Sequence, residues 1–241
     1  MNPNAADTAA VIVAAGRFTR MQGIPKLRVL LAGRPVIAHT LAAFQNTACI
    51  REIVTVARED DMLFLKKVCR EYGFTKVSAI VPGGDTRQGS VAKGIAALTA
   101  GARYVAVHDG ARPLATPAMI ARVAEAAHRF GAAAAAVRVK DTVKLSDSDD
   151  FIERTPPRDR LWNVQTPQIF ERTMYEQALQ SSLEKGYDFT DDCQLVEQTG
   201  RPVYLCEADY ANLKITTPED IAVADALLRL RRAEKEIEIC E

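Results

Sequence analysis

A glycine followed by basic side chains comes directly after the first apolar run of the chain. The run at residues 11–14 is Val-Ile-Val-Ala, and Gly16, Arg20 and Lys26 follow it. Glycine lets backbone N–H groups approach an anion and basic side chains neutralise it, which favours a loop that binds nucleotide phosphates. It is not a common phosphate loop, because no Gly-Lys-Ser/Thr follows and Phe18 replaces the second glycine of G-x-G. The alternative is an ordinary turn with solvated arginines.

Two further loops follow apolar runs and carry groups that suit a nucleotide. Gly-Gly-Asp at residues 83–85 could present backbone and carboxylate groups to a base, and Ser90 could bind the same ligand. Asp109 follows the apolar run 104–107 and could hold Mg²⁺ that bridges phosphate oxygens. Each has an ordinary alternative: a tight turn, a solvent-facing serine and a capping aspartate. Lys214 could add a cation to the site, or could be a surface lysine.

The chain carries no pattern typical of metal-ligand clusters or nucleophilic catalysis. Its three histidines and five cysteines show no metal-ligand spacing. Residues 147–150 resemble the start of a calcium loop, but the central glycine is missing and Arg158 occupies the twelfth position. Phosphoryl or nucleotidyl transfer fits this pattern, because it depends on positioning and charge neutralisation more than on a nucleophilic side chain.

The charge balance argues against a general nucleic-acid or membrane-surface binder. Lys+Arg and Asp+Glu number 31 each, so the formal net charge is zero, whereas such binders need a positive excess. The N-terminus lacks the basic region of a signal peptide, and no apolar run approaches the length of a membrane span. We therefore expect a soluble, cytoplasmic enzyme with scattered, reduced cysteines and with no nucleic-acid or membrane partner.

Strand-like and helix-like segments alternate along the chain, which predicts an α/β fold with a mostly parallel sheet. Strands are expected at residues 9–14, 53–57, 77–81 and 104–107, and helices at residues 35–44, 61–72, 87–99 and 117–130. Open parallel sheets bind ligands beyond the carboxyl ends of their strands. Because each candidate loop follows a predicted strand, we expect the three loops to meet at one edge of the sheet.

The second half of the chain departs from this alternation. The alanines at residues 132–136 are predicted to form a buried strand. Residues 142–145 and 151–155 flank a polar turn and predict a hairpin, which is too small to bury a core and should contact a second subunit. The remaining expected elements are a helix from about residue 173, a strand at 202–206 and a final amphipathic helix from 218.

Six motifs, taken in order, give the chain a resemblance to a known family. They are Ala14-Ala15-Gly16 with Arg20-Met21 and Pro25-Lys26; Gly83-Gly84-Asp85-Thr86-Arg87 with Ser90-Val91; Val107-His108-Asp109-Gly110-Ala111-Arg112-Pro113; Lys140-Asp141-Thr142; Leu161-Trp162 with Gln165-Thr166-Pro167-Gln168; and Asn212-Leu213-Lys214-Ile215-Thr216. From about residue 8 to 228 the chain closely resembles the 2-C-methyl-D-erythritol 4-phosphate cytidylyltransferases of the non-mevalonate isoprenoid pathway. The resemblance implies a Rossmann-like nucleotidyltransferase fold, with helices on both faces of the sheet, in a single domain over residues 1–241. It also implies a homodimer in which a protruding hairpin arm, residues 138–160, embraces the partner.

The resemblance further implies a reaction and the residues that serve it. CTP and 2-C-methyl-D-erythritol 4-phosphate would give 4-diphosphocytidyl-2-C-methyl-D-erythritol and pyrophosphate, with Mg²⁺ held by Asp109. The implied catalytic residues are Arg20, Lys26, Arg158 and Lys214. The implied CTP contacts are Ala14, Ala15, Gly16, Arg17, Gly84, Asp85 and Ser90. The implied contacts with the acceptor substrate are Asp109, Arg112, Thr142, Arg158, Thr166, Thr190 and Lys214, of which Thr142 and Arg158 would serve the neighbour's site.

Two positions depart from the family pattern. Phe18 replaces the second glycine of the usual Gly-x-Gly loop, and Leu27 follows Lys26 where glutamine is usual. Phenylalanine resists φ > 0 and adds bulk near the β- and γ-phosphates, so weakened CTP binding or an altered loop is expected. Two rival functions stay open: a cytidylyltransferase for another polyol phosphate such as ribitol 5-phosphate, and a non-catalytic nucleotide-binding protein on the same fold.

Overall fold

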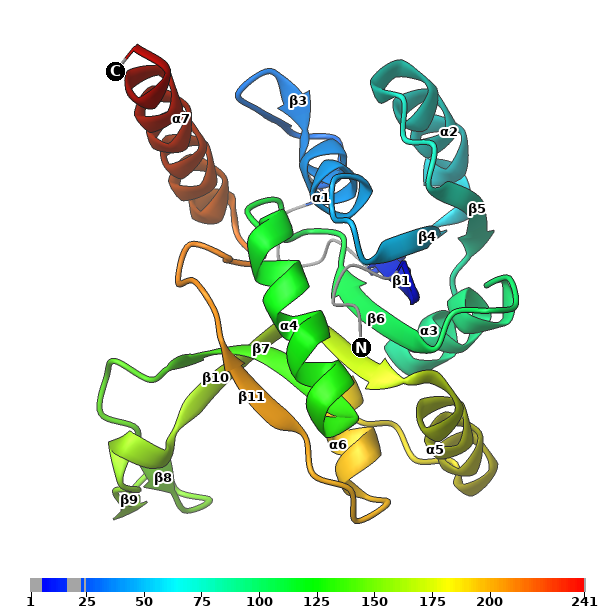
Figure 1. The fold of residues 1–241 in the computed structure, drawn as a ribbon. Coiled ribbons are helices and arrows are strands. Elements are labelled where there is room, and N and C mark those ends of the chain that lie inside the picture. Colours follow the sequence, from blue (N-terminus) through cyan, green and yellow to red (C-terminus); the bar gives the residue numbers. More distant parts are fainter. Residues whose placement is uncertain (1–5, 17–22, 24, 241) are drawn as a thin grey trace.

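A seven-stranded sheet forms the centre of the molecule (Figure 1). The computed structural model describes residues 6–16, 23 and 25–240 of the chain. From one edge to the other the strands are β11 (Tyr204–Glu207), β7 (Ala132–Arg138), β10 (Trp162–Glu171), β6 (Tyr104–Asp109), β1 (Thr8–Ala14), β4 (Ile50–Ala57) and β5 (Val77–Pro82). Within this sheet only β10 runs antiparallel to its neighbours. The mostly parallel α/β fold expected from the sequence is confirmed.

Helices cover both faces of this sheet and enclose two separate cores. One face is covered by α1 (Val36–Gln45), α2 (Glu59–Tyr72), α4 (Pro117–Phe130) and the beginning of α7 (Pro218–Cys240), and the other by α3 (Arg87–Ala96), α5 (Arg172–Lys185) and α6 (Asp192–Glu197). Successive side chains of a strand point to opposite faces. Accordingly Ala10 and Ile12 of β1 enter the first core and Ala9 and Val11 enter the second, all of them fully buried. Strand β1 is thus fixed from both sides.

Helix α4 begins and ends where the sequence predicts. Thr116 is its N-cap and accepts a hydrogen bond at 3.2 Å from the backbone N–H of Met119. Pro117 occupies the first turn, and Gly131 ends the helix in the left-handed conformation, with φ of 86°. The alanine segment that follows is the buried strand β7, as expected.

Strand β10 is an element that the sequence analysis did not assign. It pairs with both β6 and β7 and shifts register between Val164 and Gln168, where the Thr166–Pro167 peptide bond is cis. Proline is rare inside strands, which hid this one. The short helix α6 and the two-residue pair β2 (Leu30–Leu31) and β3 (Arg34–Pro35) were also unassigned, and the helix expected at 87–99 ends at Ala96.

The hairpin arm extends beyond the sheet at the lower left of Figure 1. It contains β8 (Leu145–Ser146) and β9 (Ile152–Arg154), which pair antiparallel, and the single turn η2 (Arg158–Arg160). Phe151 is 72% exposed and Ile152 is 64% exposed. The arm therefore presents apolar side chains that its own domain does not cover.

The root of the arm is fixed by contacts between cations and aromatic rings. The guanidinium of Arg138 lies 4.0 Å from the ring centre of Trp162, and Lys140 Nζ lies 3.6 Å from the ring centre of Tyr210. The Tyr210 hydroxyl also donates to the Arg138 carbonyl at 2.8 Å. Each contact between a cation and an aromatic ring stabilises an exposed site by about 0.5–1 kcal/mol. Together these contacts fix the orientation of the base of the arm relative to the sheet.

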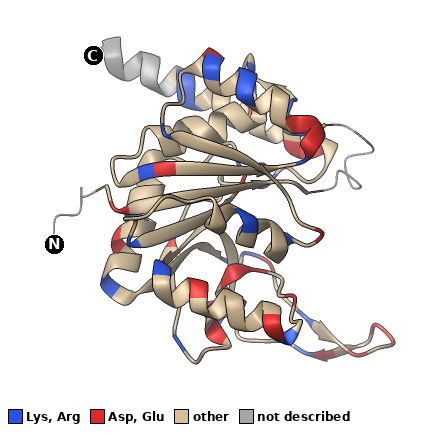
Figure 2. Cartoon of the chain, turned by 90° about the vertical axis from the view of Figure 1, so that its right-hand side faces the viewer, with Lys and Arg blue, Asp and Glu red and all other residues tan. Residues whose placement is uncertain are grey.

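Charged side chains of both signs are intermixed along the chain (Figure 2). This distribution agrees with the zero formal net charge. Among the described helices, none has the length and apolar character that a membrane crossing requires.

Candidate active site

The carboxyl ends of β1 and β6 and the loop after β5 surround a cavity of about 370 Å³. The sequence-predicted site residues that line it are Ala14, Ala15, Gly16, Lys26, Gly84, Asp85, Ser90, Asp109 and Lys214. Loops far apart in the sequence therefore meet at one edge of the sheet, as predicted for a parallel sheet. Arg17, Phe18 and Arg20 lie outside the described residues.

The loop between β5 and α3, which we call the nucleotide loop (residues 83–86), approaches the end of β1 very closely. A Cβ on Gly83 would lie 2.4 Å from that of Ala15, and a Cβ on Gly84 would lie 2.8 Å from the backbone of the first turn of α3. Only glycine allows this approach. Ser90 is buried, and its hydroxyl accepts from the Gly84 N–H at 3.0 Å and donates to the Thr86 carbonyl at 2.9 Å. These contacts define the path of the loop next to β1.

Asp109, the last residue of β6, lies among cations. Its Oδ2 lies 3.0 Å from Lys214 Nζ and 3.4 Å from Arg112 Nε. Its backbone N–H donates to the hydroxyl of Thr166 at 3.0 Å. Burial alone would raise the pKa of the Asp109 carboxyl, but Lys214, Arg112 and Arg87 outweigh burial and hold that pKa well below its usual value. The site therefore contains a fixed carboxylate at neutral pH.

Lys26 reaches the same wall of the cavity from the first loop. Its Nζ donates to the carbonyl of Ile215, next to Lys214, at 3.1 Å. The following residue, Leu27, is only 2% exposed and packs in the hydrophobic core. This burial explains why a hydrophobic residue suits the position. Arg28 then binds Asp61 of α2 with N–O distances of 2.9 and 2.7 Å. These contacts fix the segment that presents Lys26.

Several predicted contacts of the acceptor substrate do not line this cavity, as far as the described residues go. Arg112 and Thr166 contact Asp109 but do not line the cavity. Arg112 Nη1 donates to the carbonyl of Asn212 at 2.7 Å, and Thr166 is buried. Thr142 and Arg158 lie on the arm. Thr190 is exposed before α6, and its hydroxyl donates to Gln194 Oε1 at 3.1 Å. The structure thus brings the described residues predicted to contact CTP together in one cavity and leaves the arm residues apart.

Two residues near the site were not proposed from the sequence. Arg87 lines the cavity, although the sequence analysis had used it only as part of a motif. Asn212 is fully buried, and its Nδ2 donates to Gln165 Oε1 at 2.8 Å and to the Thr166 carbonyl at 3.0 Å. Asn212 therefore fixes the backbone that leads to Lys214. Its place in the sequence, two residues before Lys214, is the signal from which this role could have been predicted.

His108 precedes Asp109 but belongs to the core. It is fully buried, and its ring centre lies 4.8 Å from that of Phe44. Burial lowers the pKa of His108 to about 3, so the ring is neutral at physiological pH. It packs against Phe44 of α1, and it does not line the cavity.

The donor set of the site suits a magnesium ion that is shared with phosphates. Among the described residues, no three His, Cys, Asp or Glu side chains gather as a self-sufficient metal site. Mg²⁺ is usually bound through one or two carboxylates together with substrate phosphates. The single ionised carboxylate of Asp109, at the end of β6, fits that type of site.

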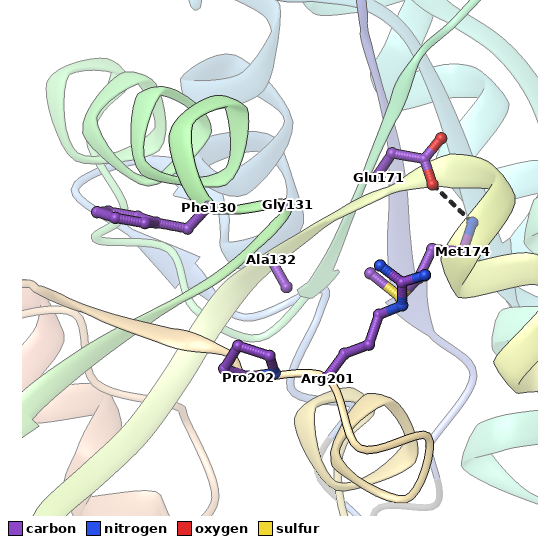
Figure 3. A pocket seen from close by; sticks show the side chains of 7 residues that line it. All are labelled: Phe130, Gly131, Ala132, Glu171, Met174, Arg201 and Pro202. Carbon is purple, nitrogen blue, oxygen red and sulfur yellow. Dashed lines mark hydrogen bonds between the residues drawn. The ribbon is translucent and has the colours of Figure 1, made fainter.

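A second, smaller cavity of about 170 Å³ lies at the opposite edge of the sheet (Figure 3). Its one carboxylate, on Glu171, accepts from the backbone N–H of Met174 at 2.7 Å and caps α5. Arg201 and Met174 also line this cavity. Because its carboxylate already caps a helix, this cavity is the poorer candidate.

The mostly parallel sheet, with a cavity at its strand ends where Asp109 lies beside Lys214, has the Rossmann-like fold of nucleotidyltransferases. The profile of the IspD family, 2-C-methyl-D-erythritol 4-phosphate cytidylyltransferase, matches residues 8–230. The chain belongs to this family, and the family resemblance found in the sequence is confirmed.

Individual relatives resemble the chain over most of their length. A 2-C-methyl-D-erythritol 4-phosphate cytidylyltransferase of Pelotomaculum thermopropionicum is 46% identical, with 93% of this chain and 95% of the relative covered. One of Caldanaerobacter subterraneus is 44% identical, with 92% and 99% covered. The crystal structure of the 4-diphosphocytidyl-2C-methyl-D-erythritol synthase of Anaerococcus prevotii matches with a TM-score of 0.83 at 34% identity, covering 92% of this chain and 96% of that one.

Proposed function

We propose that the protein transfers the cytidylyl group of CTP to 2-C-methyl-D-erythritol 4-phosphate. The products are 4-diphosphocytidyl-2-C-methyl-D-erythritol and pyrophosphate. The observation that carries this proposal is the cavity wall, where Lys214 pairs with Asp109 and Lys26 binds the carbonyl of the adjacent Ile215. Membership of a cytidylyltransferase family supports the choice of nucleotide and acceptor.

The reaction needs charge neutralisation more than proton transfer. A phosphate oxygen of the acceptor attacks the α-phosphorus of CTP, and the bond from that phosphorus to the bridging oxygen of the β-phosphate breaks. A phosphate monoester is largely dianionic at neutral pH, with a second pKa of about 6, so no general base is required. Two anions must nevertheless approach each other, and fixed cations reduce their repulsion.

The cations divide between the two substrates. Lys26, with Arg20, neutralises the charge that builds up around the α-phosphorus. Lys214 holds the acceptor phosphate together with Arg158 from an arm. The remaining acceptor contacts are assigned to Asp109, Arg112, Thr142, Thr166 and Thr190. These assignments extend the family resemblance to the positions of this chain.

The cytidine is assigned to the nucleotide loop and the end of β1. Backbone groups of Ala14, Ala15 and Gly84 and the side chains of Asp85 and Ser90 recognise base and ribose, and Gly16 and Arg17 contact the phosphates. The position of the loop supports this assignment, because Gly84 and Asp85 line the same cavity as Ala14 and Ala15.

Asp109 is proposed to hold Mg²⁺ together with phosphate oxygens of CTP. When bound, the ion supplies positive charge that polarises the reacting phosphate. The position of the Asp109 carboxylate in the cavity, at the end of β6, supports this role.

The arm is proposed to complete the acceptor side of the site in a second copy of the chain. The exposed Phe151 and Ile152 support this dimer, since burying such side chains stabilises an interface by about 1.5–3 kcal/mol each. Thr142 and Arg158 would then act in the neighbour's cavity. A cytoplasmic location is supported by the free cysteines Cys49, Cys69, Cys193 and Cys206.

Pyrophosphate release tests the proposal. Each of the four nucleoside triphosphates is incubated with Mg²⁺ and either methylerythritol phosphate or ribitol 5-phosphate, and released pyrophosphate is measured. Release only with CTP and methylerythritol phosphate is expected. Release with CTP and only the ribitol ester would assign a different acceptor, and no release with any pair would indicate a binding protein without turnover.

A further inference from the structure

A buried ion pair fixes the beginning of α3 to a distant part of the chain. Arg87 Nη2 lies 2.7 Å from Asp192 Oδ2, and the Asp192 side chain is only 2% exposed. The other Asp192 oxygen accepts a hydrogen bond from the hydroxyl of Tyr175, which is fully buried. Removing one partner of such a pair leaves an uncompensated buried charge. The start of α3 and the start of α6 are therefore held as one unit.

A second set of hydrogen bonds strengthens this connection. Gln88 Nε2 donates to the Ser182 hydroxyl at 3.0 Å, and Gln88 Oε1 accepts from the Phe189 N–H at 3.4 Å. From β10, Gln168 Oε1 accepts from the Asp192 N–H at 3.0 Å. The segment at residues 186–192, which carries the proposed acceptor contact Thr190, is thus held between α3 and β10.

The same Arg87 also lines the cavity to which CTP is assigned. It lines the cavity together with Asp85 and Ser90 of the nucleotide side. Its side chain remains 27% exposed, although its partner is buried. Arg87 therefore touches both regions: its guanidinium binds Asp192, and its backbone continues directly from the nucleotide loop.

We propose that Arg87 is a positioning residue that couples the nucleotide subsite to the acceptor segment through Asp192. CTP that settles on the nucleotide loop fixes the start of α3, and the ion pair transmits this order to residues 186–192. Binding of either substrate thereby favours binding of the other. The inference rests on the proposed function, because it assigns CTP to one side of Arg87 and the acceptor phosphate to the other.

The test is the dissociation constant of a CTP analogue with a methylene bridge between the α- and β-phosphorus, measured by calorimetry on the full-length protein. It is measured without and with saturating methylerythritol phosphate, after pyrophosphate release by the wild type has established the substrate pair. We expect the acceptor to tighten analogue binding at least about fivefold in the wild type. Arg87→Lys keeps the charge but loses the planar fork, so this ratio should fall to about one while the analogue still binds.

Asp192→Asn should lower the same ratio, since it keeps a hydrogen-bonding group beside Tyr175 but loses the charge. The matched control is Arg172→Lys, which alters an Arg–Glu pair with an N–O distance of 2.7 Å on α5, away from the cavity. The control should keep the wild-type ratio. In turnover, Arg87→Lys should raise KM for each substrate, measured at a saturating concentration of the other, more than it lowers kcat.

Two results would overturn the inference: a wild-type ratio of one, or a wild-type ratio retained by Arg87→Lys. An active wild type with either result would contradict the coupling alone. A wild type that releases no pyrophosphate would remove the proposed function and the coupling with it. Thermal melts of each variant separate loss of coupling from loss of fold.

Discussion

The nucleotide loop and the arm differ in how much of their structure the single chain supplies. In the nucleotide loop, the glycines contact the end of β1, Ser90 bonds the loop from within, and Arg87 connects it to buried Asp192. The arm is fixed only at its root, and its tip exposes Phe151. One half of the proposed site is therefore assembled by described residues of one chain, whereas the other half would, under the proposed dimer, need the arm of a second copy.

The largest effect is expected from a substitution in the half of the proposed site that one chain assembles. Lys26→Met removes a cation from the cavity wall and should lower kcat about 10²–10³-fold, the usual cost of losing one group that stabilises transition-state charge. Steady-state pyrophosphate release measures the change. The matched control is Lys66→Met on the exposed face of α2, which should retain wild-type kcat. A Lys26→Met enzyme with near-normal kcat would remove this lysine from the chemistry.

The next largest effect is expected from substitutions in the arm, which is proposed to complete the site of a second copy. Phe151→Ser combined with Ile152→Asp removes two exposed apolar side chains from the arm and should weaken the dimer at least about a hundredfold. Sedimentation at several protein concentrations measures this change, and specific activity should fall on dilution in parallel. If the double variant stays dimeric and fully active, the arm tip does not form the interface.

A smaller effect should follow from filling the close contact of the nucleotide loop. Gly83→Ala places a methyl group 2.4 Å from the Ala15 Cβ, and such overpacking costs about 1–3 kcal/mol. Urea denaturation should show this loss in the free energy of unfolding. Gly16→Ala is the stability control, since its added methyl meets nothing within 4 Å. Equal stabilities of the two variants would contradict the tight fit of the loop.

The smallest effect concerns the residue that departs from the family pattern. Phe18→Gly should lower the dissociation constant for CTP by up to about tenfold, because glycine accepts the positive φ that a phosphate loop can require. Calorimetry with CTP and Mg²⁺ measures this constant. A dissociation constant unchanged in Phe18→Gly would show that the phenylalanine does not weaken the loop.

The sequence predicted well which loops meet at the carboxyl ends of the strands, because the signals for these loops are local. Apolar runs that end in glycine or aspartate predicted the strand ends, and the parallel sheet then brought Gly84 and Asp109 together. It missed β10, where a proline interrupts the strand, and it missed the Arg87–Asp192 pair. That pair joins distant elements through a buried contact, and no local pattern of residues signals such pairing.

The most direct test of a site shared between two chains is complementation in a heterodimer. Chains carrying Lys26→Met and Arg158→Met are given different tags, coexpressed, and purified on both tags in sequence. If the arm serves the neighbour's cavity, one cavity of the heterodimer has both wild-type halves, and pyrophosphate release should be about half that of the wild-type dimer. Activity no higher than that of the two parent variants would contradict the shared site.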